Sequence, residues 1–155
     1  WIECHLVSLG AAKVITVDYG TLISHLPHVT TMRWSSLAAA FAKNQLPLFD
    51  AAVSFSSVEH SGLGRYGDPL NPYGDLQTMA QIWCLLKANG TLFLAVPVGT
   101  VDTVFFNGGR SYGPMRLPHL VANFRVLVGR TVLGTPGLKE LDWHQQPTLV
   151  LQKPL

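Results

Sequence analysis

Residues 49–99 decide the fold, and they read FDAAVSFSSVEHSGLGRYGDPLNPYGDLQTMAQIWCLLKANGTLFLAVPVG. An apolar run comes first, followed by a glycine-rich loop, a stretch with helical spacing of apolar residues, and a second apolar run. This order predicts a strand, a loop, a helix and a strand, which is one unit of a parallel sheet. In such sheets ligands bind at the carboxyl ends of the strands, so we expect a cleft where residues 49–55 end.

The rest of the chain extends this pattern on both sides. A glycine follows a helix-like start at residues 1–9, and Ser35 or Ser36 is a candidate cap for a helix that runs to residue 43. Asp75 is a candidate cap for a helix that ends near residue 86, and a short helix is expected at 118–123. Apolar runs predict strands at 14–18, 29–33, 49–55, 92–96, 124–133 and 148–152, with turns at 89–90, 107–109 and 134–137.

These elements predict an α/β fold with a mostly parallel sheet and antiparallel strands near the C-terminus. We find no repeat, linker or low-complexity segment, so we expect a single domain over residues 1–155. Residues 56–75 form the longest predicted loop, and loops of this length usually have a function.

Composition narrows the classes of function. Charged residues make up 13% of the chain and hydrophobic residues 48%, which favours burial against a partner or self-association. The net charge of +2 comes without a basic stripe, so we expect no nucleic-acid partner. The apolar runs are shorter than the ~18 residues of a membrane span, so none is expected. Cys4 and Cys84 stand far apart, which favours two buried thiols in a reducing intracellular compartment and no metal site.

Several short motifs, taken in order, resemble class I S-adenosylmethionine-dependent methyltransferases. The acidic end of VITVDYG at Asp18, then Phe49-Asp50, then Glu59-His60, then the Lys87–Gly90 turn match that family over residues 14–97. The resemblance implies a Rossmann-like methyltransferase sheet and S-adenosylmethionine as cofactor. The acceptor of the methyl group would be a small molecule, a glycan or a protein side chain.

A closer resemblance covers nearly the whole chain. The stretches SSVEHSGLGRYGDPLNPYGDLQTMA and YGPMRLPH are similar to the uncharacterised domain-of-unknown-function family 268, which looks like an offshoot of the methyltransferase fold. The first strand and glycine-rich loop of a methyltransferase would lie before Trp1. We therefore expect an N-terminally truncated domain that, as given, binds the cofactor weakly.

The resemblance also implies roles for residues at the ends of two strands. Asp18 would accept hydrogen bonds from the ribose hydroxyls of the cofactor, and Tyr19 would pack beside its adenine or sugar. Ser56 and Ser57 would line the methionine end of the cofactor or the substrate. Their alternative role is to cap the loop through local hydrogen bonds.

Glu59 and His60 are the best acid–base candidates, because an imidazole titrates near neutral pH and a carboxylate beside it can orient it. The alternative is a pair that braces the loop. Arg65 would either clamp an acidic substrate or pair with Asp68 or Asp75. Two other functions stay open: an inactive module that keeps the fold for binding or scaffolding, and a nucleotide-sugar or nicotinamide enzyme.

Overall fold

A computed structural model describes residues 1–129 and 146–155. The chain divides into two compact units, residues 1–47 and residues 48–155, and each is described by itself. The expectation of a single domain over the whole chain stays a prediction.

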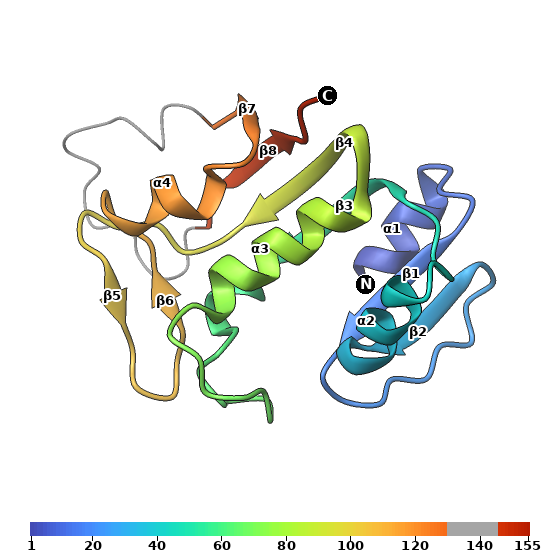
Figure 1. Ribbon diagram of the computed structural model, residues 1–155, viewed down its shortest axis with the longest axis horizontal. Helices are drawn as coiled ribbons and strands as arrows, with labels where there is room; N and C mark the ends of the chain where they lie inside the picture. Colours follow the sequence, from blue (N-terminus) through green and yellow to red (C-terminus); the bar gives the residue numbers. More distant parts are fainter. Residues whose placement is uncertain (130–145) are drawn as a thin grey trace. The chain divides into compact units, whose positions relative to one another are not determined.

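The first unit contains a pair of parallel strands and two helices (Figure 1). Its elements are α1 (Ile2–Ser8), β1 (Val14–Asp18), β2 (Val29–Arg33) and α2 (Trp34–Ala42). β1 and β2 pair from Val14 with Val29 to Asp18 with Arg33, at the residues that the apolar runs predict. The predicted cap of α2 is wrong, because Arg33 precedes the first helical residue and makes no capping side-chain bond.

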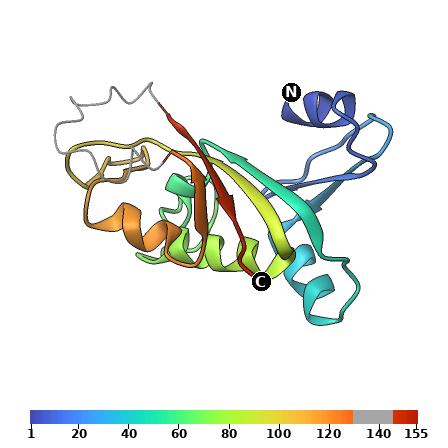
Figure 2. The same cartoon turned by 90° about the horizontal axis from the view of Figure 1, so that it is seen from above.

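The second unit contains a four-stranded sheet in the order β3-β4-β8-β7. β3 (Phe49–Phe55) runs parallel to β4 (Leu86–Ala95), and β8 (Thr148–Gln152) lies between β4 and β7 (Arg125–Val128), antiparallel to both. α3 (Gly74–Leu85) and α4 (Arg116–Val121) lie on one face of this sheet (Figure 2). The chain therefore has the mixed α/β architecture that its sequence predicts. The expectation of a mostly parallel sheet is wrong for this sheet, because β3 and β4 pair in parallel whereas the β4–β8 and β8–β7 pairs are antiparallel.

The core of the second unit lies between this sheet and its two helices. Leu92 and Leu94 alternate with more exposed residues along β4 and are fully buried, as are their partners Leu151 and Leu149 on β8. This two-residue period places one apolar face of each strand against the helices. Residues of the helices complete the core, among them Met79, Ile82, Leu117 and Leu120.

The starts of two predicted elements differ from the structure, and two short strands were not predicted. β4 begins at Leu86, and the predicted turn at 89–90 is a pairing irregularity within it, where Asn89 has a φ of 60° and its N–H donates to the carbonyl of Lys153. α4 begins at Arg116, two residues before the predicted start. The turn at 107–109 joins two short strands that were not predicted, β5 (Thr103–Val104) and β6 (Arg110–Ser111). The turn predicted at 134–137 lies outside the described residues.

The long loop after β3 is ordered rather than irregular. It starts with a single 3-10 turn, η1 (Val58–His60), and then closes on itself, because the N–H of Asn71 donates to the carbonyl of Gly62 at 2.9 Å. Inside it, the buried carboxylate of Asp68 accepts hydrogen bonds from the N–H groups of Gly62, Gly64 and Tyr66. Residues 62–74 thus form a compact Ω-loop, and we use this name for them below.

The closing of the Ω-loop predicts a difference between two of its glycines. A Cβ on Gly62 would lie 2.1 Å from the carbonyl oxygen of Asn71, whereas a Cβ on Gly67 would meet nothing within 4 Å. Both residues have a positive φ, of 81° and 82°, so both substitutions to alanine cost about 1–2 kcal/mol in backbone strain. We expect Gly62→Ala to lower the free energy of unfolding well beyond Gly67→Ala, as measured by urea denaturation. Equal losses would contradict the close approach at Gly62.

Three features bear on the classes of function considered above. Within residues 1–129 and 146–155, no helix is long and apolar enough to cross a membrane. In the same part of the chain, no three His, Cys, Asp or Glu side chains are grouped so as to hold a metal ion. Cys4 and Cys84 are both free and exposed, so the expectation of buried thiols is wrong.

Candidate functional site

The carboxyl end of β3 brings together three of the predicted site residues. The Ser56 hydroxyl donates to Oε1 of Glu59 at 2.8 Å, and Nε2 of His60 lies 3.6 Å from the same oxygen. Ser56 has a φ of 48°, which is rare for a residue with a side chain and which turns the chain sharply at the end of the strand. From the other side, the side-chain amide of Gln146 donates to the Ser56 hydroxyl at 3.0 Å. We call Ser56, Glu59 and His60 the strand-end cluster.

Glu59 is the most unusual member of this cluster. Its side chain is fully buried, and its second carboxyl oxygen, Oε2, has no hydrogen-bond partner among residues 1–129 and 146–155. Burial raises the pKa of Glu59, and the bond from Ser56 and the nearby imidazole of His60 only partly oppose this. A buried carboxyl oxygen without a partner is costly, and such groups in folded proteins call for an explanation. One such explanation is that Oε2 binds or exchanges a proton with a ligand.

His60 is held by the turn between β5 and β6. Its Nδ1 lies 2.7 Å from the carbonyl oxygen of Gly108, and its ring packs edge-on against the ring of Tyr66, with centroids 5.4 Å apart. Although neighbours in sequence need not face each other, the 3-10 turn brings Glu59 and His60 to the same side. The sequence therefore predicted this pair, but nothing in it pointed to the backbone carbonyl that orients the imidazole.

The other predicted cofactor residues lie outside the strand-end cluster. Ser57 is exposed, and its carbonyl accepts a hydrogen bond from the N–H of His60. In the first unit, Asp18 is exposed at the end of β1, where its Oδ1 accepts from the N–H of Gly20 at 2.7 Å. The ring of Tyr19 lies 6.4 Å from that of Trp34. A carboxylate has a second oxygen, so this turn leaves Asp18 able to accept from a ligand.

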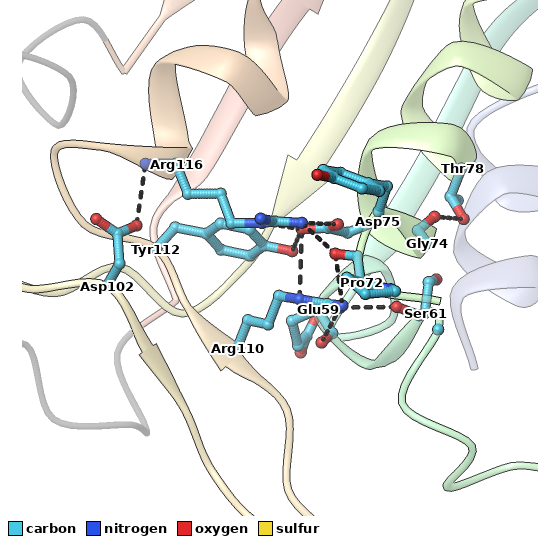
Figure 3. A network of polar contacts seen from close by, with 12 residues as sticks. Glu59, Ser61, Pro72, Gly74, Asp75, Thr78, Asp102, Arg110, Tyr112 and Arg116 are labelled. Atoms are coloured by element: carbon cyan, nitrogen blue, oxygen red, sulfur yellow. Dashed lines mark hydrogen bonds and ion pairs between the residues drawn. The ribbon is translucent and has the colours of Figure 1, made fainter. Parts of the chain in front are cut away.

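A buried ionic network lies next to the strand-end cluster (Figure 3). Its centre is the carboxylate of Asp75, which is fully buried in the first turn of α3. It accepts two hydrogen bonds from Arg116, at 2.8 and 2.6 Å, and one from the hydroxyl of Tyr112 at 3.1 Å. Nε of Arg110 lies 3.6 Å from Oδ2 of Asp75, so two cations share this carboxylate. The predicted capping role of Asp75 is wrong, because Tyr73 precedes the helix.

Arg110 connects this network to the strand-end cluster. Its guanidinium is buried and donates to the carbonyl oxygens of Glu59, Ser61 and Pro72 (Figure 3). A buried guanidinium is tolerated only when its N–H groups have partners, and here backbone carbonyls supply them. The start and the end of the Ω-loop are therefore fastened to β6.

Within the described residues, Arg65 does not make the predicted pair with Asp68 or Asp75, and its clamping of an acidic substrate stays a prediction. Its Nη1 donates to the carbonyl oxygens of Asn107 and Gly108, at 2.6 and 3.3 Å, instead of pairing with Asp68 or Asp75. Its guanidinium also lies 5.5 Å from the centre of the Tyr66 ring. Arg65 thus ties the tip of the Ω-loop to the same turn that holds His60.

The fold and this site define a mixed α/β protein with polar residues gathered at the end of a parallel strand. The sequence model of the family described as Caenorhabditis protein of unknown function, DUF268, matches residues 1–134. The chain belongs to this family. A search of curated proteins found no match.

Proposed function

We propose that this chain is part of an enzyme that transfers the methyl group of S-adenosylmethionine to an acceptor, with Glu59 and His60 as its acid–base pair. The observation that carries the proposal is the buried Oε2 of Glu59. This oxygen lacks a hydrogen-bond partner in the described part of the chain and lies in a cluster at the carboxyl end of a parallel strand. Ligands of α/β sheets bind at such strand ends. The order of motifs along residues 14–97 supports S-adenosylmethionine as the ligand.

Four residues have side chains whose chemistry suits parts of this cofactor. In the first unit, the exposed carboxylate of Asp18 suits the ribose hydroxyls, and the ring of Tyr19 suits the adenine or sugar. In the second unit, Ser56 and Ser57 suit its methionine end. When bound, S-adenosylmethionine supplies an electrophilic methyl group. Positioning is the main contribution of the protein to such chemistry, and a base is needed only where the acceptor must lose a proton.

An inactive binding or scaffold module is the second candidate. The complete burial of Glu59 favours it, since the three members of the strand-end cluster hold one another and brace the start of the Ω-loop. Under this alternative the cluster stabilises the fold, and no ligand reaches Oε2.

The two candidates differ in cofactor binding, which calorimetric titration of S-adenosylmethionine and S-adenosylhomocysteine measures. We expect micromolar binding of both compounds by the full-length protein. Asp18→Ala should weaken binding about tenfold, the equivalent of one hydrogen bond to a charged group. Asp50→Ala, which removes another exposed carboxylate, should leave binding unchanged. A folded full-length protein that binds neither compound would refute the enzyme and favour the module.

A further inference from the structure

We propose that the turn at residues 105–109 is the positioning element of the Glu59–His60 pair. The carbonyl of Gly108 holds the proton of neutral His60 on Nδ1, so that Nε2 is the basic nitrogen and faces Glu59. The catalytic meaning of this arrangement rests on the proposed function, whereas the arrangement itself does not. Gly108 and Gly109 then act on the pair without touching substrate.

The position of the proton follows from the nature of the contact. A carbonyl oxygen only accepts hydrogen bonds, so a ring nitrogen 2.7 Å from the carbonyl of Gly108 must carry hydrogen. A neutral imidazole has one N–H, which leaves the lone pair on Nε2. This nitrogen lies 3.6 Å from Oε1 of Glu59. Nε2 therefore faces the carboxyl group with its lone pair, and a proton can pass between Oε1 and Nε2 once these two atoms come within hydrogen-bond distance.

Gly109 lets the ring lie where it does. A Cβ at this position would lie 2.9 Å from Nδ1 and 3.0 Å from Cε1 of His60, and 3.2 Å from Cγ of Glu59. Any other residue here would press on both members of the pair at once. The glycine thus has a steric role in the pair, in addition to its role in the turn.

The turn itself is firmly held. Its two ends are joined by the hydrogen bonds from the N–H of Phe105 to the carbonyl of Gly109, at 2.9 Å, and from the N–H of Gly108 to the carbonyl of Phe105, at 3.0 Å. Arg65 adds bonds to the carbonyls of Asn107 and Gly108 from the Ω-loop. The accepting oxygen is therefore fixed from both sides, as orientation of an imidazole by a backbone carbonyl requires.

This geometry provides a path for one proton. With Glu59 protonated and His60 neutral, Oε2 accepts the proton of an acceptor hydroxyl while the proton on Oε1 passes to Nε2. The O–H bond of the acceptor breaks, and its oxygen keeps the electron pair. Glu59 and His60 together go from two protons, on Oε1 and Nδ1, to three, on Oε2, Nε2 and Nδ1. Burial raises the pKa of Glu59, which favours its protonated form.

Nitrogen-15 NMR of the histidine-labelled full-length protein tests the positioning without cofactor or acceptor. Signals of His60 are assigned by their loss in His60→Gln, and spectra are recorded at a pH where the ring is neutral. We expect a protonated nitrogen at Nδ1 and an unprotonated one at Nε2. The opposite tautomer, or a mixture of the two tautomers, would overturn the proposal.

Two variants of the turn extend the test. Gly109→Ala should abolish the tautomer preference, whereas Phe106→Ala, which truncates a fully exposed side chain of the same turn, should keep it. Loss of the preference in both variants, or in neither, would overturn the role of Gly109. If Gly109→Ala fails to fold, the wild-type spectrum still decides. If the expected tautomer is found but the protein does not bind the cofactor, only the proposed function is refuted. If the protein binds the cofactor but shows the opposite tautomer, only the positioning role of the turn is refuted.

Discussion

Asp75→Ala should lower the free energy of unfolding by about 3–5 kcal/mol, because it leaves the buried Arg110 without its anionic partner. The same change removes the acceptor of the Tyr112 hydroxyl and two bonds from Arg116. A typical domain is stable by 5–15 kcal/mol, so the loss is a large part of the total. Urea denaturation followed by circular dichroism measures it.

Asp50→Ala is the matched control for this prediction. Asp50 also pairs with a cation, Lys87, but both side chains are exposed to solvent, and exposed pairs contribute little. Its loss should leave the urea midpoint nearly unchanged. If both variants lose the same stability, or if Asp75→Ala loses none, the network around Asp75 does not hold this unit together.

Glu59→Gln should have the largest effect on activity, with a 10²- to 10⁴-fold loss of methyl transfer, the usual contribution of a general acid or base.

The same substitution should stabilise the protein at neutral pH. Burial raises the pKa of Glu59 in the folded state, so the folded state holds this proton more tightly than the unfolded state. The contribution of protonated Glu59 to the free energy of unfolding is fully present below the ordinary pKa of glutamate. This contribution is lost as the pH rises through the raised pKa of the folded state.

Glutamine does not ionise and so avoids that loss. Urea midpoints of wild type and Glu59→Gln should therefore agree in acid and diverge towards neutral pH, with the variant more stable. Asp68→Asn is the control of opposite sign. Burial raises the pKa of Asp68, but the hydrogen bonds from the N–H groups of Gly64, Tyr66 and Gly62 lower it by more, so the net pKa is lowered. The Asp68 carboxylate therefore stabilises the folded state at neutral pH, and Asp68→Asn should be less stable than wild type there. A Glu59→Gln variant that is less stable at every pH and keeps its activity would identify Glu59 as structural.

The sequence predicted elements whose pattern is local. Runs such as Val14–Asp18 and Thr148–Gln152 are short and mostly apolar or β-branched, and their ends agree with the structure. β5 and β6 have only two residues each, which is too short for a period to be seen. The capping role predicted for Asp75 was wrong because a helix start is a local pattern, whereas the side chains that pair with Asp75 follow it by 35 residues or more.

In the candidate site, too, contacts between residues close in sequence could be predicted, whereas contacts between distant residues could not. Ser56, Glu59 and His60 are close in sequence, and their position after a predicted strand was enough to bring them together. The carbonyl of Gly108 could not be predicted, because a backbone atom carries no residue type and the turn follows His60 by 48 residues. The pair Gly108-Gly109 in a predicted turn was the available signal, and it pointed to a tight turn but not to an imidazole against it.

The position of β8 inside the sheet has a consequence for synthesis on the ribosome. When residues up to Val128 have emerged, β3 can pair with β4, but β8, which lies between β4 and β7 and pairs with both, has not been made. Until Leu149 and Leu151 arrive, Leu92 and Leu94 lack the neighbours that cover them in the finished core. Exposed apolar surface and unpaired strand edges favour aggregation of incomplete chains. The nascent chain therefore passes through a stage in which it needs protection, and pairing of the strand at residues 148–152 ends it.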